Sequence, residues 1–412
     1  MRVLFVVTPV AGHLSPLTPL AWALRDAGHE VLVAGQPDVL PTAAAAGLHA
    51  VGVGDPFGMD EMLLDRLPAG RRLLQSWGRA PDVALAADFA RSWAAHNTTV
   101  LPAYLDLARG FRPDLIVGDI LEFTSLVLGG VLGVPVVHHR WGVDPLGDPT
   151  LLQAREAHRA LCASVGLPAL PEPDLLLDPC PPSLQLPGIR AASPIRHLHS
   201  HGNGTLPPWL PAHWAAENAR TPAERTPTVL VSLGRSTLKL NGAPLFRSVL
   251  AAFGELPGTR ALATVDAAHR QELGPLPPNV RLIDHTPLHM LFRISDAVVH
   301  HGGAGTSMSA SYAGLPQLVL PQLADTFASA ERLVHAGAAL SLDTAAEQDD
   351  PATIARALSA LLTEPHHARA ARRLRTEMEA MPTPTRVVTD LERLVRDRDR
   401  AAATPHREEA HA

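Results

Sequence analysis

Short, uninterrupted apolar runs recur in both halves of this 412-residue chain and constrain its fold more than any other feature. Strands buried on both faces of a parallel sheet have this pattern, because helices cover both faces. Helical patterns follow the runs, as over 17–27 before Gly28. The sequence therefore predicts an α/β fold with two doubly wound, Rossmann-like parallel sheets. The strands expected are 2–8, 30–34, one that follows a helix within 40–53, 115–117, 135–138, 228–232, 260–265, 280–284, 296–300 and 317–320.

The length suits two domains that face each other across a cleft. We expect one Rossmann-like domain over 1–205 and a second over 228–382. The segment from about 187 to 227 is rich in Pro, Gly, His and Thr and lacks periodicity, which indicates a linker, expected over 206–227. A helix over 383–400 is a candidate to cross back to the first domain, and 401–412 is expected to be a disordered tail.

Composition and charge argue against several partners. The formal net charge is −6, and no basic stripe with interleaved aromatic residues occurs, so we expect no nucleic acid. No apolar run reaches the roughly 18 residues of a membrane helix, so no stable membrane insertion is expected. An apolar strand follows Met1-Arg2 directly, without a signal peptide, and Cys162 and Cys180 lack metal or redox spacing. These features predict a cytoplasmic protein.

A glycine-rich turn between a buried strand and a helix is the most informative motif. It comprises His301, Gly302, Gly303, Gly305 and Thr306, and a helix is expected from Thr306 onward. Glycines let a ligand approach the backbone, and a helix start offers free N–H groups and a partial positive charge. We interpret the turn as an anion cradle. The alternative is a tight strand–helix turn that merely requires glycine.

A second turn, at Ser232, Gly234 and Arg235, is a candidate to donate to the same phosphate, although an ordinary strand–helix turn has the same composition. The tandem pairs His138-His139 and His300-His301 do not indicate a metal, since adjacent strand residues point to opposite faces. We expect neither a metal nor a cofactor.

His13, in the first strand–helix loop, is the candidate general base. Asp119, at the carboxyl end of its strand, is the first candidate to orient it, and Glu122 the second. The alternative is a histidine without a catalytic task. The candidate acceptor walls are Trp141, Val143, Phe57, Trp77 and Phe89, although core packing explains each aromatic residue singly.

Several motifs resemble the antibiotic-type family 1 glycosyltransferases over nearly the whole chain. The N-terminus with Gly12-His13 and Pro16-Leu17 is similar to the start of that family. Three further stretches resemble the family's nucleotide-diphosphate signature: Pro287-Leu288, residues 300–306 and residues 313–322. More narrowly, 139–145 and 177–185 resemble the rhamnosyltransferase that acts on the spinosyn aglycone and its close relatives.

The resemblance implies a GT-B fold and an inverting transfer without a metal. It assigns acceptor binding to the domain over 1–205 and nucleotide-sugar binding to the domain over 228–382. His13 then matches the family's base, Asp119 its partner, and the glycine turn its pyrophosphate binders. The implied donor is a TDP-deoxysugar such as TDP-L-rhamnose, and the implied acceptor is an apolar polyketide hydroxyl. A homodimer is compatible with this resemblance.

Two positions depart from the family pattern. Asp325-Thr326 stands where Asp-Gln is usual, which puts the contact with the donor sugar in doubt. His285 stands where a tryptophan often covers the base. Two alternatives therefore stay open: a nucleotide-sugar epimerase of the same fold, and a non-catalytic homologue that acts as a partner.

Overall fold

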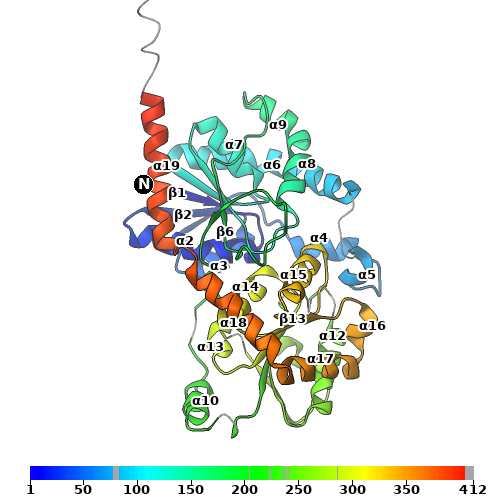
Figure 1. The fold of residues 1–412 in the computed structure, drawn as a ribbon. Helices are drawn as coiled ribbons and strands as arrows, with labels where there is room; N and C mark the ends of the chain where they lie inside the picture. Colours follow the sequence, from blue (N-terminus) through cyan, green and yellow to red (C-terminus); the bar gives the residue numbers. More distant parts are fainter. Residues whose placement is uncertain are drawn as a thin grey trace, which may run out of the picture.

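The computed structural model describes residues 1–77, 83–203, 205–221, 224–234, 237, 239–240, 242–284 and 286–403. Its core is two parallel sheets, which confirms the doubly wound α/β prediction (Figure 1). The first sheet, in the N-terminal lobe, has the strands β1 (Arg2–Val6), β2 (Glu30–Gly35), β3 (Ala50–Gly52), β4 (Leu115–Asp119), β5 (Val136–His139), β6 (Leu175–Asp178) and β7 (Ser193–Pro194). The second, in the C-terminal lobe, has β8 (Thr228–Ser232), β9 (Arg260–Thr264), β10 (Val280–Ile283), β11 (Ala297–His300), β12 (Gln317–Val319) and β13 (Ala339–Ser341).

Both sheets have the same winding. Their strand orders are β3-β2-β1-β4-β5-β6-β7 and β10-β9-β8-β11-β12-β13. The chain reverses its direction of winding between β1 and β4 in one sheet and between β8 and β11 in the other. Ligands of open parallel sheets bind beyond the carboxyl ends of the strands at such a reversal. The topology therefore indicates one edge of each lobe as the place where a ligand is expected to bind.

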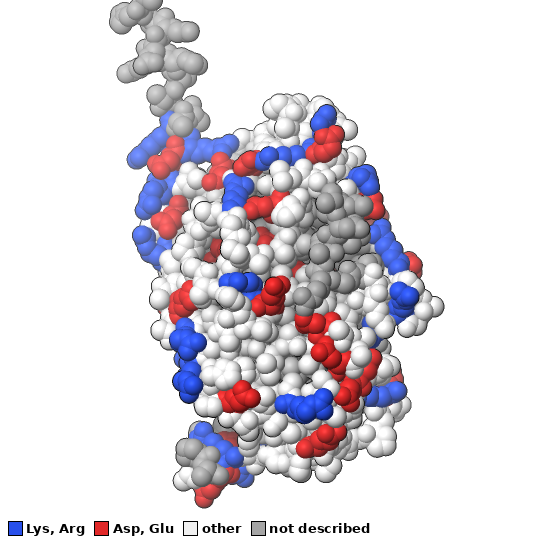
Figure 2. Space-filling view, turned by 45° about the vertical axis from the view of Figure 1, so that its right-hand side comes forward, with Lys and Arg blue, Asp and Glu red and all other residues white. Residues whose placement is uncertain are grey.

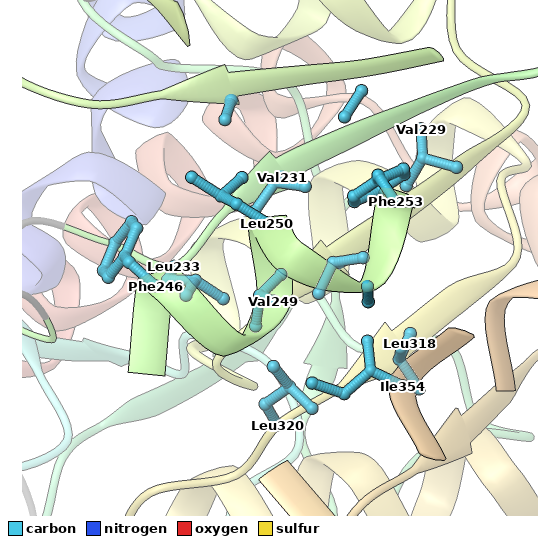
Figure 3. Close-up of a cluster of buried hydrophobic side chains, with 14 of the residues drawn as sticks. Val229, Val231, Leu233, Phe246, Val249, Leu250, Phe253, Leu318, Leu320 and Ile354 are labelled. Carbon is cyan, nitrogen blue, oxygen red and sulfur yellow. The ribbon is translucent and has the colours of Figure 1, made fainter. Parts of the chain in front are cut away.

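Alternate residues of the central strands pack on opposite faces of each sheet. In β1, Val3 and Phe5 contact α2 (Thr18–Asp26), whereas Leu4 and Val6 face α6 (Val83–Phe111) and α7 (Phe123–Leu132). In the C-terminal lobe, one face packs against α12 (Ala243–Ala251) and α17 (Pro351–Thr363), as Figure 3 shows. Burial on both faces explains why these strands are uninterrupted apolar runs.

The segment 206–227, expected to be an irregular linker, contains the helix α10 (Trp209–Asn218). Leu210 of this helix is fully buried and packs with Leu230 and Leu262 on one face of the second sheet. The expectation of irregular structure was wrong there, because tertiary burial stabilises a helix whose sequence periodicity is weak.

Other boundaries also differ from the prediction. β6, β7 and β13 were not predicted; each is short, and β7 has only two residues, too few for a period to show. The helix after the glycine turn, α14 (Ala304–Ala313), begins two residues before Thr306, because Gly303 already occupies its N-cap. The last helix, α19, continues to Ala403, while residues 404–412 lie outside the described residues.

The last helices return the chain to its beginning. α18 (Pro365–Ala380) packs on α14 of the C-terminal lobe, and α19 (Pro384–Ala403) then lies beside α2 of the N-terminal lobe (Figure 1). Val387, Val388 and Leu391 are buried in the same cluster as β1 and α2. The His29 Nε2 atom lies 3.1 Å from Glu392 Oε1 across this junction. α19 is therefore part of the N-terminal core.

The remaining elements are short connections around the two sheets. They comprise α1 (Ala11–Leu14), α3 (Leu40–Ala45), α4 (Met59–Arg66), α5 (Leu73–Trp77), α8 (Gly147–Ala157), α9 (Arg159–Ser164), α13 (Leu288–Phe292), α15 (Ala324–His335) and α16 (Ala345–Asp349). None of the described helices is long and apolar enough to span a membrane. On the face shown in Figure 2, acidic and basic side chains are interspersed.

Candidate active site

The predicted base and its partner meet where the first sheet reverses its winding. His13 lies in α1, directly after β1, and Asp119 ends the neighbouring strand β4. The His13 Nδ1 atom is 3.3 Å from Asp119 Oδ1, although it lacks the alignment of a full hydrogen bond. Asp119 is completely buried, whereas the His13 side chain keeps 18% of its surface exposed. This arrangement leaves Nε2 of His13 as the atom that can accept a proton from a ligand.

Asp119 is held in place by three donors besides His13. The backbone N–H and the hydroxyl of Thr8 donate to its two carboxylate oxygens at 2.7 and 3.0 Å, and the N–H of Leu121 donates at 3.0 Å. Burial raises the pKa of Asp119, but the charge of His13 and these hydrogen bonds outweigh it and lower the pKa below its ordinary value. Asp119 is thus a fixed carboxylate beside the imidazole.

Glu122, the second candidate partner, has a different task. It is the N-cap of α7, and its Oε1 accepts from the N–H of Thr124 at 2.8 Å. Burial, aided by the charge of Asp119, raises the pKa of Glu122 to about 7. The two acids therefore have opposite shifts, and Asp119 is the one that contacts the histidine.

Trp141 covers His13 from the loop after β5. The two ring centroids are 3.9 Å apart with an angle of 47° between the planes. The ring also packs against the core that β1 and α2 share. Trp141, a candidate acceptor wall, is therefore in direct contact with the candidate base.

The glycine turn lies at the equivalent reversal in the second lobe. His300 pairs with Ser232 across β11 and β8, so the residues that follow them, His301 and Gly234, also meet. A Cβ on Gly303 would lie 2.4 Å from His301 Nε2, and one on Gly234 would lie 2.7 Å from its Cε1. Gly234 and Gly302 have positive φ values of 79° and 88°. Glycine is thus required here both for close approach and for conformation.

His301 itself is a neutral imidazole. Burial lowers its pKa to about 4, and its Nδ1 atom has no hydrogen-bond partner within the protein. An unpartnered buried nitrogen is costly unless a ligand or water satisfies it. His301 is therefore suited to bind a polar ligand group at the lip of the turn.

The N-terminus of α14 is uncapped, and it is open at Gly305. Its N-cap Gly303 has no side chain to cap the first N–H groups, and a Cβ on Gly305 would meet no atom within 4 Å. Thr306, in the first turn, is partly exposed. Uncapped N–H groups and the helix dipole make such an end attractive to an anion.

The tandem histidines are used within the protein. His300 Nε2 lies 2.8 Å from Gln317 Oε1, and its Nδ1 accepts from the N–H of Gly302 at 3.0 Å. His138 contacts the Ser125 hydroxyl at 2.9 Å, and His139 bonds to the carbonyl of Arg140. These described histidines therefore stabilise strands and turns.

Asp325 and Thr326 begin α15, and they differ in what they reach. Burial raises the pKa of Asp325 to about 6, while the charge of His13 in the opposite lobe lowers it. The Thr326 hydroxyl instead accepts from the N–H groups of Gln322 and Leu323, at 2.9 and 3.0 Å. Thr326 thus closes its own turn beneath Gly302, whereas Asp325 is within electrostatic reach of His13.

The other donor-side candidates line the same edge of the sheet. Ser232 ends β8 and accepts from Thr264 at 3.3 Å, Pro287 is the N-cap of α13, and Leu288 packs against the core behind it. Arg235 and His285 lie outside the described residues.

The acceptor-side candidates are spread more widely. Phe57 packs edge-on against Trp93 at 5.0 Å and His96 at 4.7 Å. Val143 is buried among residues of both lobes, including Cys180 and Met308. Trp77 ends α5 and Phe89 lies in α6, but their side chains are outside the described part of the chain.

Sequence reasoning missed the residues that hold the site together. Thr8 binds both oxygens of Asp119, and Arg140 makes buried ion pairs with Asp144 and Asp178. The sequence signal for Thr8 was a polar side chain directly after the apolar run of β1.

Comparison with known proteins identifies the family of the chain. The N-terminal domain model of the erythromycin biosynthesis protein CIII-like family matches residues 22–234, and the C-terminal domain model matches 247–394. The L-demethylnoviosyl transferase of Streptomyces niveus is 37% identical over 95% of this chain and 97% of its own length. The tylactone mycaminosyltransferase of Streptomyces fradiae is 33% identical over 96% and 92%.

A solved structure is similar over the same extent. The spinosyn rhamnosyltransferase SpnG complexed with thymidine diphosphate has a TM-score of 0.82 and 37% identity, covering 95% of this chain and 100% of that chain. The chain belongs to the erythromycin biosynthesis protein CIII-like family and is a glycosyltransferase with the GT-B fold.

Proposed function

We propose that this enzyme transfers a deoxysugar, such as L-rhamnose, from a TDP-sugar to a hydroxyl of a polyketide- or macrolide-type aglycone, with inversion and without a metal ion. The observation that carries the proposal is the contact between the two lobes beside the base. A Cβ on Gly142, next to Trp141, would lie 3.4 Å from Ala304 Cβ, the first residue of α14. His13 and the anion-binding helix start therefore belong to one site.

The donor side supplies electrostatic stabilisation. As the glycosidic bond breaks, negative charge develops on the diphosphate leaving group. The uncapped N–H groups of α14, the glycine turn and the neutral imidazole of His301 are placed to stabilise this charge. Thymidine diphosphate bound to SpnG, a relative at 37% identity, supports TDP as the nucleotide.

The acceptor side supplies the base. Asp119 holds the Nδ1 side of His13, so Nε2 takes the proton of the acceptor hydroxyl as its oxygen attacks the sugar carbon. The diphosphate leaves from the opposite face of the sugar, and a single displacement inverts the configuration. Relatives named for tylactone and 10-deoxymethynolide support an apolar polyketide acceptor.

Titration calorimetry with TDP and UDP, each with and without EDTA, tests the donor side. We expect TDP to bind more tightly than UDP and EDTA to have no effect. Absence of binding to either nucleotide would contradict the anion cradle, and loss of binding in EDTA would contradict the metal-free mechanism.

Transfer assays with TDP-L-rhamnose and a panel of tylactone, 10-deoxymethynolide, aklavinone and spinosyn aglycone test the acceptor side. His13→Ala should abolish transfer while leaving TDP affinity near that of the wild type. His269→Ala, which changes an exposed histidine paired with Glu272, is the matched control. Full transfer by His13→Ala would exclude His13 as the base.

A further inference from the structure

Arg140 is a deeply buried charged side chain near the site, with 1% of its residue surface exposed. Its guanidinium makes three separate contacts: Nε with Asp144 at 3.0 Å, Nη1 with Asp178 at 2.9 Å, and Nη2 with the carbonyl of Arg190 at 2.9 Å. A planar guanidinium can satisfy three acceptors in fixed directions, which a lysine cannot do. The network therefore fixes both the position and the orientation of residue 140.

The same network holds the other end of Trp141. Gln185 donates to the carbonyl of Gly142 at 3.1 Å and to Asp178 at 3.0 Å, and its Oε1 accepts from the N–H of Asp144 at 3.2 Å. Trp141 thus stands between two anchored neighbours. Buried ion pairs of this kind contribute little net stability but define geometry where they are fully satisfied.

The loop between β5 and α8, residues 140–146, contacts both sides of the site. The Trp141 ring lies over His13 at 3.9 Å, and Gly142 packs against α14, where a Cβ would meet Met308 Cγ at 3.0 Å. A Cβ at position 142 would therefore be tight against α14, and the Met308 side chain would have to move by a few tenths of an ångström to accept it. A shift of this loop would therefore move the ring over the base and the helix at the donor side together.

We propose that Arg140 is a positioning residue: through the loop 140–146, it holds Trp141 over His13 and Gly142 against α14, and so it sets the base relative to the donor. This proposal rests on the proposed role of His13 as the base. It gives a task to the motif 139–145 and to Asp178 and Gln185, which contact neither the base nor the helix start themselves.

Shielding of His13 can be measured without turnover. Diethyl pyrocarbonate acylates neutral imidazoles that reach solvent, and mass spectrometry of peptides gives the rate at His13 relative to the exposed His269. In Arg140→Lys, the rate at His13 should rise about fivefold, since losing roughly one hydrogen bond shifts a local equilibrium by about that factor. Trp141→Ala should raise it at least as much.

The double variant separates a local role from general destabilisation. If Arg140 acts through Trp141, Arg140→Lys/Trp141→Ala should acylate no faster than Trp141→Ala alone. Additive rates, or an unchanged rate in Arg140→Lys, would overturn the proposal. Leu358→Ala, in the core of the C-terminal lobe, controls for lost stability and should leave His13 shielded.

Gln185→Met provides a second route if Arg140→Lys fails to fold, because it removes the hydrogen bond to Gly142 without removing a charge. It too should expose His13 and lower kcat more than it raises KM for TDP-L-rhamnose. Exposure of His13 without a fall in kcat would overturn the positioning role alone. Full turnover by His13→Ala would instead overturn the proposed function, whatever the acylation rates.

Discussion

At the scale of single residues, the pKa values of two acids three positions apart shift in opposite directions. Asp119 has a lowered pKa because His13 and three donors favour its charged form, whereas burial raises the pKa of Glu122 to about 7. Environments that separate two carboxyl groups in this way assign them different tasks. In the proposed mechanism the ionised one orients His13, and the other caps α7.

Asp119→Asn tests the first assignment. The amide cannot stabilise a protonated His13, and its NH₂ group would face donors where the carboxylate accepted. We expect kcat to fall by about 10²-fold or more while TDP affinity, measured by calorimetry, is unchanged. Asp114→Asn, which changes the acid before the same strand, is the control and should keep its activity. Equal activity of the two variants would contradict the role of Asp119.

Glu122→Gln tests the second assignment through pH. The pKa of Glu122 is 4.5 in the reference state and about 7 in the folded protein, so the folded state binds the proton more tightly. The free energy of unfolding of the wild type, relative to the variant, should therefore decrease as pH rises from 4.5 to about 7, by about 3 kcal/mol in total. Urea unfolding at pH 5 and pH 8 measures it, and a difference independent of pH would refute the shifted pKa.

At the scale of elements, most strands were predictable but their exact ends were not. The apolar runs in β1, β4, β8 and β11 are uninterrupted because both faces of each strand are buried. Such runs can be recognised in the sequence without the structure. β13, with only three residues, is defined by its pairing with β12 and not by its own pattern. The start of α14 was misplaced because Gly303, an N-cap without a side chain, has no capping signal.

Part of the candidate site could also be predicted from the sequence. His13 and Asp119 were identifiable because each follows a strand at the edge where two strands end. Thr8 and Arg140 were not, since their roles depend on partners 111 and 38 positions away. Only the fold brings such partners together.

Two glycines of the turn give a matched pair of variants. A Cβ on Gly305 would meet nothing, whereas one on Gly303 would lie 2.4 Å from His301 Nε2. Gly305→Ala should therefore keep or raise the melting temperature, as alanine favours a helix, while its methyl group weakens TDP binding at least about tenfold. Gly303→Ala should lower both the melting temperature and the affinity for TDP. Gly110→Ala in α6 is the control, and unchanged TDP affinity in Gly305→Ala would place the diphosphate elsewhere.

At the scale of the whole molecule, the chain passes between the lobes more than once. The ion pairs Lys239–Glu61 and Arg72–Asp349 bridge the lobes at 2.6 and 3.0 Å, and His197 of the connecting segment contacts Ser309 of α14 at 3.0 Å. α19 then adds its apolar face to the N-terminal core. The two lobes are thus joined by contacts as well as by the chain, which lets the base and the helix start keep a common geometry.

Leu391→Ala tests how far α19 stabilises the N-terminal lobe. Leu391 is fully buried against α2, so its truncation should cost about 2–5 kcal/mol and lower the melting temperature. TDP is proposed to bind the other lobe, so calorimetry should show unchanged TDP affinity. Arg393→Ala, at an exposed position of the same helix, should leave both quantities unchanged. If Leu391→Ala instead weakened TDP binding without lowering the melting temperature, α19 would act on the donor site rather than on the core.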